Sequence, residues 1–178
     1  MDQGRALALA ALLSTLSLAG CATAGGGVGE GAPGGNQVGA PVPDIHVESL
    51  GGKALGLDQY RGKVVLLDVW ASWCGPCKQE LPMLDDMAKR LHGDGVEVLA
   101  VSVDQQRANV VKFLKQRPHW SLTIAHDPSG QIADRLAPEK MPTSYIIDRE
   151  GIIRFVNSGF EPSDAAVIER RLADVARH

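Results

Sequence analysis

The chain has 178 residues, of which 44% are hydrophobic, and its formal net charge is −3. Its 18 Lys and Arg residues do not exceed its 21 Asp and Glu residues. A basic excess is therefore absent, and nucleic acid is not an expected partner. The length allows one ordinary domain and some additional chain.

The N-terminal residues have the pattern of an export signal. A short start with Arg5 is followed by an apolar run over residues 6–19, which suits the hydrophobic region of a signal peptide. The run ends in Leu18-Ala19-Gly20-Cys21, which resembles the bacterial lipobox. That resemblance implies a signal peptide of residues 1–20 and a lipid on the thiol of Cys21. The alternative is an ordinary signal peptide in which Cys21 is incidental.

The segment after Cys21 is rich in glycine, with eight glycines between residues 22 and 43 and almost no large apolar side chain. Such a segment cannot bury enough surface to offset the entropy lost on ordering. We therefore expect residues 21–43 to form a lipidated, flexible tether and residues 44–178 to form the folded domain.

Apolar runs in the second part of the chain predict strands. Residues 63–70 and 96–103 are nearly continuous apolar runs, which is typical of strands covered on both faces in a central parallel sheet. Residues 144–148 and 152–156 flank a short turn and predict a β-hairpin. A weaker hairpin is expected from residues 45–47 and 55–57.

Apolar residues at helical spacing predict three helices. The first carries its apolar face on Cys77, Leu81, Leu84, Ala88 and Leu91. The others are expected around residues 110–114 and 165–175. The order of these elements indicates an α/β fold with a central mixed β-sheet, helices on both faces, and an N-terminal β-hairpin extension.

Cys74-Gly75-Pro76-Cys77 lies where the first buried strand ends and the first helix begins. Unpaired N–H groups and the helix dipole at this position favour the Cys74 thiolate, which makes Cys74 the expected nucleophile. Cys77 lies about one turn into the helix, where it is more shielded and fits the resolving thiol.

Two thiols at this spacing have other uses. A structural zinc site needs about four ligands, and the His residues show no matching spacing. Cu(I) binding is a second alternative. An inert disulfide is a third, although so short a loop gains little stability from closure. Redox exchange is the favoured interpretation, and neither a metal nor a cofactor is expected.

The stretch WASWCGPC at residues 70–77, followed by Met141-Pro142-Thr143, resembles the thioredoxin superfamily. Further segments are similar to its TlpA/ResA-like branch of membrane-tethered thiol–disulfide oxidoreductases. They are YRGKVV at 60–65, CKQELP at 77–82, VSVD at 101–104 and PTSYIIDREG at 142–151. The similarity covers nearly all of residues 44–178.

This resemblance implies a thioredoxin-like fold with a redox-active Cys74–Cys77 disulfide. It also implies a cis peptide bond between Met141 and Pro142, since only an X-Pro bond adopts cis readily. The residues expected to bind substrate are Trp73, Gly75, Pro76, Met141 and Pro142.

Two acidic residues are candidates for proton transfer with Cys77. Asp68 lies inside the first apolar strand, where a charge is unusual, and thioredoxins carry a buried Asp at this place. Glu80 lies three residues after Cys77, close to the same helical face, and the tethered branch often has an acid there. Alternatively, Asp68 reaches solvent or a lysine, and Glu80 is solvated or pairs with Lys78. His126 has no evident partner and is expected in a loop.

The residues between the cysteines bear on the direction of electron flow. Gly75-Pro76 adds no positive charge that would stabilise the thiolate, which favours the disulfide and makes the dithiol a good electron donor. With the lipobox, this predicts an extracytoplasmic, lipid-anchored, monomeric protein-disulfide reductase, on the periplasmic side in a two-membrane cell. Ala22 after the lipidated cysteine favours the outer membrane.

The resemblance also implies partners for such a reductase. Its substrates would be protein disulfides, either in apocytochrome c during cytochrome c maturation or in general disulfide repair. Its electron donor would be a DsbD/CcdA-like membrane protein. A dithiol oxidase of the same fold and a copper-binding chaperone remain the alternative functions.

Overall fold

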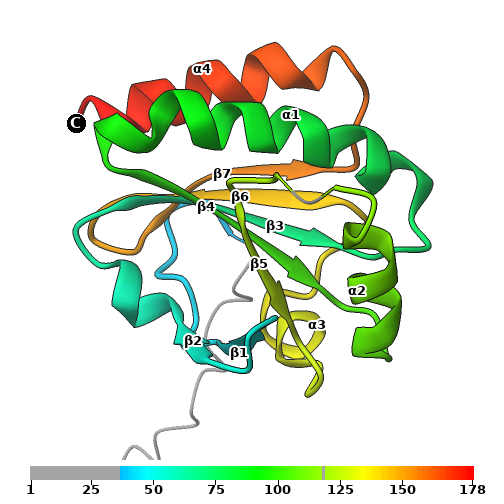
Figure 1. The fold of residues 1–178 in the computed structure, drawn as a ribbon. Coiled ribbons are helices and arrows are strands. Elements are labelled where there is room, and N and C mark those ends of the chain that lie inside the picture. The colour runs from blue at the N-terminus through cyan, green and yellow to red at the C-terminus, as the bar shows by residue number, and fades with distance from the viewer. Residues whose placement is uncertain (1–36, 118) are drawn as a thin grey trace, which may run out of the picture. The chain divides into compact units, whose positions relative to one another are not determined.

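The computed structural model describes residues 37–117 and 119–178, so the predicted signal peptide, Cys21 and most of the predicted tether lie outside the described residues. Seven strands form one sheet in the order β2-β1-β5-β4-β3-β6-β7 (Figure 1). The pairs β3–β4 and β4–β5 are parallel, and the remaining pairs are antiparallel. The predicted mixed sheet is thus confirmed.

The strands are β1 His46–Ser49, β2 Ala54–Gly56, β3 Val64–Trp70, β4 Val96–Ser102, β5 Thr123–His126, β6 Thr143–Ile147 and β7 Ile153–Ser158. The α-helices are α1 Gly75–Leu91, α2 Arg107–Leu114, α3 Gln131–Leu136 and α4 Asp164–Ala176. Two short 3-10 helices, η1 Leu57–Tyr60 and η2 His92–Asp94, precede β3 and β4. The predicted strands and helices are all present, whereas β5 and α3 were not predicted.

Helices cover both faces of the sheet, as the sequence predicts. Figure 1 shows α1 and α4 side by side on one face and α3 on the opposite face. Leu81 and Leu84 of α1 and Ile168 of α4 belong to one hydrophobic core. Ile132 of α3 belongs to a second core on the other face. The sheet therefore separates two apolar layers.

The central strand β3 contributes to both cores because successive side chains of a strand point to opposite faces. Val64, Leu66 and Trp70 belong to the core beneath α1. Val65, Leu67 and Val69 belong to the core that contains α3. Asp68 shares the parity of the first set, so its carboxyl group enters the layer between the sheet and α1.

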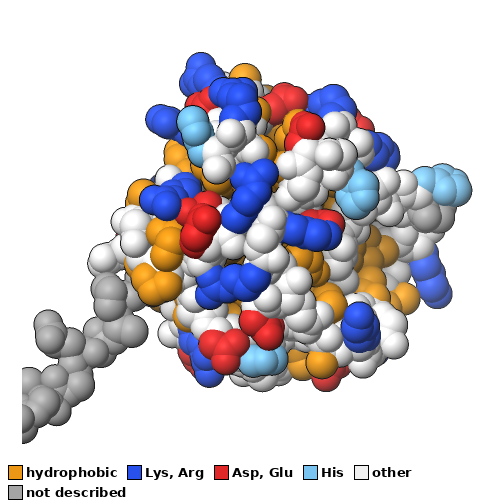
Figure 2. Space-filling view, turned by 90° about the vertical axis from the view of Figure 1, so that its left-hand side faces the viewer, with side chains coloured by type: hydrophobic (Ala, Val, Ile, Leu, Met, Phe, Trp, Pro, Cys, Tyr) orange, Lys and Arg blue, Asp and Glu red, His pale blue; other side chains and the backbone are white. Residues whose placement is uncertain are grey.

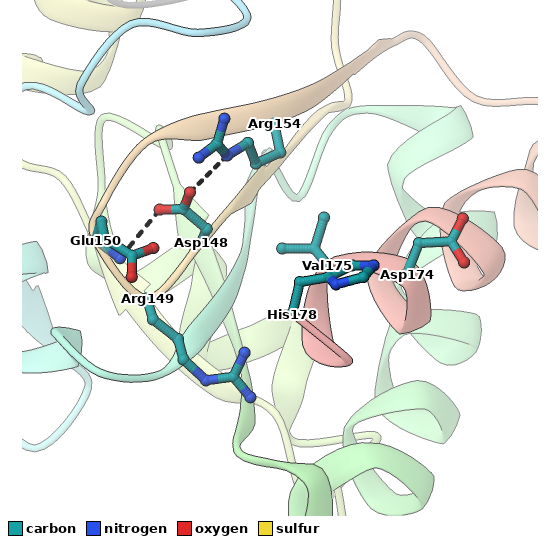
Figure 3. A pocket seen from close by; sticks show the side chains of 7 residues that line it. All are labelled: Asp148, Arg149, Glu150, Arg154, Asp174, Val175 and His178. Atoms are coloured by element: carbon teal, nitrogen blue, oxygen red, sulfur yellow. Dashed lines mark hydrogen bonds and ion pairs between the residues drawn. The ribbon is translucent and has the colours of Figure 1, made fainter.

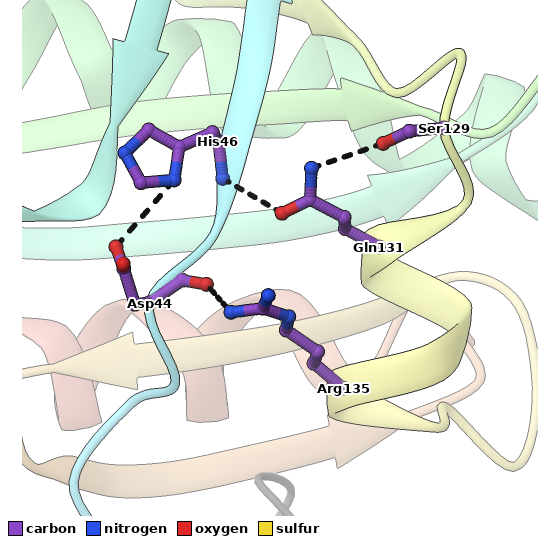
Figure 4. A network of polar contacts seen from close by, with 5 residues as sticks. All are labelled: Asp44, His46, Ser129, Gln131 and Arg135. Carbon is purple, nitrogen blue, oxygen red and sulfur yellow. Dashed lines mark hydrogen bonds and ion pairs between the residues drawn. The ribbon is translucent and has the colours of Figure 1, made fainter.

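The N-terminal hairpin extends the sheet at one edge. β1 pairs with β2 and with β5, both antiparallel. Polar contacts join the hairpin segment to α3 (Figure 4): the His46 N–H donates to Gln131 Oε1 over 3.2 Å, and the Arg135 guanidinium donates to the Asp44 carbonyl oxygen. The predicted N-terminal extension is therefore a bound part of the fold.

The chain just before this hairpin also contacts the sheet. The Gly39 N–H donates to the Ile153 carbonyl oxygen, the Ile153 N–H donates to the Ala40 carbonyl oxygen, and the Val42 N–H donates to the Gly151 carbonyl oxygen. Residues 39–42, which belong to the predicted tether, are therefore hydrogen-bonded to residues 151–153.

Candidate active site

A disulfide joins Cys74 and Cys77, with their Cα atoms 5.3 Å apart. Cys74 is the N-cap residue of α1, and the Cys77 N–H donates to its Sγ over 3.2 Å. An N–H donor and the positive end of the helix dipole would both stabilise negative charge on Cys74 after reduction. Cys77 is fully buried, whereas Cys74 keeps a small exposed area. These positions suit a nucleophile at Cys74 and a shielded second thiol at Cys77.

The other predicted residues of the motif are open to solvent. Trp73 is 68% exposed, the largest value among the exposed large hydrophobic side chains of the described chain. Gly75 and Pro76 form the exposed first turn of α1. Trp70, by contrast, is fully buried in the core. The residues next to Cys74 are therefore open to solvent, and their contact with substrate stays a prediction.

The Met141–Pro142 peptide bond is cis. Pro142 lies directly before β6, and its carbonyl oxygen accepts a hydrogen bond from the Gly159 N–H over 2.8 Å. Met141 is partly buried against the core that contains both cysteines. The segments 74–77 and 141–142 thus meet at one core, although their roles in binding substrate remain a prediction.

The loop that carries Trp73 is held by Asp104, which sequence reasoning assigned no role. The Asp104 carboxylate accepts hydrogen bonds from the Ser72 N–H and hydroxyl over 2.8 and 2.7 Å, and from the Ser102 hydroxyl over 2.7 Å.

The loop prediction for His126 is wrong: this residue ends β5, is buried, and has Nε2 2.6 Å from the Asp104 carbonyl oxygen. Because the ring is buried, its nitrogen needs a polar partner, which the Asp104 carbonyl oxygen supplies.

Asp68 and Glu80 meet in the buried layer between β3 and α1, where Glu80 lies one helical turn after Cys77. Both side chains are fully buried. The hydroxyl of Ser144 on β6 lies 2.8 Å from Glu80 Oε1 and 3.3 Å from Asp68 Oδ1. The alternatives in which Asp68 reaches solvent or a lysine, and Glu80 is solvated or pairs with Lys78, are therefore wrong.

Burial sets the protonation of these two acids. Burial raises the pKa of Asp68 well above its usual range, the nearby Glu80 carboxylate raises it further, and the Ser144 hydroxyl opposes both effects. Burial also raises the pKa of Glu80, to about 7, with Ser144 opposing the rise and Asp164 adding to it. A carboxyl group that titrates near neutrality can both accept and return a proton at physiological pH.

A separate hollow lies at the other end of β6. It has a volume of about 360 Å³, and Figure 3 shows the side chains around it. They are Asp148, Arg149, Glu150, Arg154, Asp174, Val175 and His178. Figure 2 views the molecule from this end, where basic, acidic and apolar side chains are interspersed. None of the predicted site residues lines this hollow.

Two further observations concern the described residues only. Within residues 37–117 and 119–178, no three His, Cys, Asp or Glu side chains are grouped so as to hold a metal ion. In the same ranges, no helix has both the length and the apolar character needed to cross a membrane.

Comparisons with known proteins agree with this geometry. Residues 38–156 match the model of the AhpC/TSA family. A relative called thiol-disulfide oxidoreductase ResA, from Geobacillus thermodenitrificans, is 34% identical over 122 residues, which are 68% of this chain and 70% of that protein.

Solved structures give the same likeness. A crystal structure described as a thiol:disulfide interchange protein DsbE, from Chlorobium tepidum, has a TM-score of 0.75 and 36% identity, covering 79% of this chain and 98% of that one. The exposed lipoprotein thioredoxin Etrx1 of Streptococcus pneumoniae has a TM-score of 0.64 and 32% identity, covering 74% of this chain and 99% of that one.

Proposed function

Because the chain belongs to the AhpC/TSA family of thioredoxin-like proteins and is a ResA-like thiol–disulfide oxidoreductase, we propose that it reduces disulfides of extracytoplasmic proteins. The observation that carries this proposal is the Cys74–Cys77 disulfide at the start of α1, with Glu80 buried one turn further along the helix and Asp68 buried near Glu80. In this proposal, Cys74 is the nucleophile, Cys77 is the resolving thiol and the two acids accept a proton.

The reaction would proceed in two exchanges. The Cys74 thiolate of the reduced protein attacks a substrate disulfide and forms a mixed disulfide. Cys77 then loses its proton to the carboxyl pair and attacks Cys74, which releases the reduced substrate and leaves the Cys74–Cys77 disulfide. An external dithiol must then restore the reduced form, and we propose a DsbD/CcdA-like membrane protein for that step.

The proposed direction of electron flow rests on the motif. Gly75 and Pro76 carry no charge, so the single N–H bond to Cys74 Sγ and the helix dipole are the features that favour its thiolate. Strong oxidants of this chemistry stabilise the reduced form much more. A weakly stabilised thiolate favours the disulfide product and hence reduction of the substrate. Protein disulfides, including those of apocytochrome c, are the proposed substrates.

The proposed location outside the cytoplasm rests on residues 1–21. The lipobox at Leu18-Ala19-Gly20-Cys21 supports lipid attachment at Cys21, and the glycine-rich segment that follows would form the tether. The structural relative Etrx1 is itself called a lipoprotein. Labelling cells with [³H]palmitate tests the anchor: wild type should incorporate label and Cys21→Ala should not, and an unlabelled wild type would contradict the proposal.

The reduction potential of the Cys74–Cys77 pair tests the proposed direction. Equilibration with glutathione buffers, followed by quantification of free thiols, should give a value between about −180 and −270 mV, in the range of reducing oxidoreductases. A value well above about −180 mV would indicate a dithiol oxidase instead. A competition assay with a Cu(I) chelator examines the copper-chaperone alternative, for which the reduced protein would have to retain the metal.

A further inference from the structure

A polar group is buried between β3, β6 and α1. Asp68 on β3 and Ser144 on β6 are directly opposed across the antiparallel pair, and Glu80 approaches from α1. None of the three side chains is more than 1% exposed. One hydroxyl thus lies within hydrogen-bonding distance of two carboxyl groups, at 2.8 and 3.3 Å.

The number of hydrogens in this group limits its charge. Ser144 has one hydroxyl hydrogen and can donate it to one carboxylate only. The second contact is a hydrogen bond only if that carboxyl group is protonated and donates to the Ser144 oxygen. In the described part of the chain, no Lys, Arg or His lies within ion-pair distance of Asp68 or Glu80. Two hydrogen bonds at Ser144 therefore require that the pair of acids holds one proton.

The groups that face this cluster are few. Glu80 comes from α1, one turn after the buried Cys77, and Asp68 comes from β3. Asp164 at the start of α4 acts on Glu80 through its negative charge. One oxygen of each buried acid, Asp68 Oδ2 and Glu80 Oε2, has no hydrogen-bond partner within the described residues. These two oxygens are free to accept a second proton.

We propose that Ser144 is a positioning residue that joins Asp68 and Glu80 into one proton-holding unit, which takes the Cys77 proton during resolution of the mixed disulfide. The inference deepens the proposed function and rests on it. Ser144 need not touch substrate. Its hydroxyl keeps the two carboxyl groups together and stabilises the charged form of whichever acid is ionised, so that the unit is ready to accept a proton near neutral pH.

Resolution of the mixed disulfide moves one proton and one electron pair. The Cys77 S–H bond breaks and its proton passes to a carboxylate oxygen of the unit. The Cys77 sulfur forms the bond to Cys74 Sγ, and the bond between Cys74 and the substrate sulfur breaks. The substrate leaves as a thiolate with the electron pair. The two cysteines are oxidised, the substrate disulfide is reduced, and no other oxidant is needed.

Stopped-flow reaction of the reduced protein with dithiobis(nitrobenzoate) tests the proposal. Attack by Cys74 releases the first thionitrobenzoate and attack by Cys77 releases the second, so the second phase isolates the resolving step. Removing the hydroxyl in Ser144→Ala should raise the pKa of both acids, because Ser144 lowers each. The pH midpoint of the second phase should then move upward by about one unit, the size expected from one hydrogen bond to a charged group.

Two matched variants separate positioning from general damage. Ser144→Thr keeps the hydroxyl and should retain the wild-type midpoint. Tyr145→Phe removes a buried hydroxyl from the next residue of β6, on the opposite face, and should also retain it. An unchanged midpoint in Ser144→Ala, or an equal shift in Ser144→Thr, would overturn the proposal.

An independent measurement covers the case in which Ser144→Ala does not fold. Infrared spectra of the oxidised wild type should show a protonated carboxyl band at about pH 6, where ordinary carboxyl groups are ionised, and Asp68→Asn/Glu80→Gln should lack it. A wild type without this band contradicts the shared proton. A wild type that never releases the second thionitrobenzoate contradicts the proposed function itself, so the two failures are distinguishable.

Discussion

Two buried aspartates of the sheet, Asp68 and Asp148, have opposite protonation behaviour. Asp68 has one hydrogen-bond partner, the Ser144 hydroxyl at 3.3 Å, and its pKa is raised. Asp148 follows β6 at the other end of the strand, where its carboxylate accepts from two backbone N–H groups and from Arg154. Burial raises the pKa of Asp148, but these bonds together bring it below its ordinary value.

The difference teaches that burial and the supply of donors act together: Asp68 is fully buried and has one donor, whereas Asp148 is less deeply buried and has three. At Asp148, the donors close the turn between β6 and β7 and hold a permanent carboxylate. At Asp68, donors are scarce and a second acid is adjacent, so the pair of acids can bind and release a proton. Structural and proton-transfer roles should therefore be separable by substitution.

The largest effect is expected when the two buried acids Asp68 and Glu80 are made neutral. Asp68→Asn/Glu80→Gln should slow the second phase of the thionitrobenzoate reaction about 100-fold at neutral pH, since a positioned base contributes about that much. The single variants should show smaller losses because the remaining acid can act. Asp148→Asn is the control and should leave this phase unchanged. Equal rates in the double variant and wild type would contradict the proton-transfer role.

The pH dependence of stability should distinguish the two carboxyl sites next. Glu80 has a folded pKa of about 7 against an ordinary value of 4.5, so the folded state holds more protons between these values. Stability must then fall as pH rises through this window, by roughly 3 kcal/mol for 2.5 pH units. Denaturant unfolding of oxidised wild type and Glu80→Gln at several pH values measures this loss of stability.

The free energy of unfolding of wild type should fall relative to that of Glu80→Gln as pH rises from about 4.5 to 7. Parallel stability curves would show that Glu80 does not change its proton binding on folding. The pKa shift of Asp148 has the opposite direction. Its lowered pKa contributes stability that is present above the ordinary carboxyl range and is lost only as pH falls through the folded value.

At neutral pH, neutral substitutions of the two aspartates should change stability in opposite directions. Asp148→Asn removes the charge from three hydrogen bonds and should destabilise the fold by about 1–3 kcal/mol. Asp68→Asn replaces an acid that burial disfavours in its charged form, and should be neutral or stabilise by about 1 kcal/mol. Thermal and denaturant unfolding at one pH measure both. Two losses of equal size would contradict the distinction between the sites.

Much of the fold could be predicted because its central elements are long and buried. The strands at residues 63–70 and 96–103 and the hairpin at 144–156 have continuous apolar patterns, and each lies where it was expected. The four-residue strand β5 and the six-residue helix α3 are too short to give a period. Their positions depend on tertiary pairing, which a local pattern does not contain.

The same limit applies to the site. Asp68 and Glu80 could be identified because a charge in an apolar strand and an acid one turn after Cys77 are local signals. Ser144 is 76 residues from Asp68, and only the β3–β6 register brings them together. The predicted hairpin contained Ser144 but did not specify which strand would pair with it. Asp104 was likewise part of a recognised segment. Its hydrogen bonds to Ser72, however, depend on how the end of β4 lies beside the end of β3.

The smallest effect is expected at the exposed side of the Asp148 network. Arg154 is half exposed, so its ion pair with Asp148 is screened by solvent, and Arg154→Ala should cost no more than about 1 kcal/mol. The backbone N–H groups of Glu150 and Ile152 remain to hold the carboxylate. Unfolding at low and high salt measures the effect, which should shrink as salt rises. A loss as large as that of Asp148→Asn would mean that Arg154, and not the backbone, keeps Asp148 ionised.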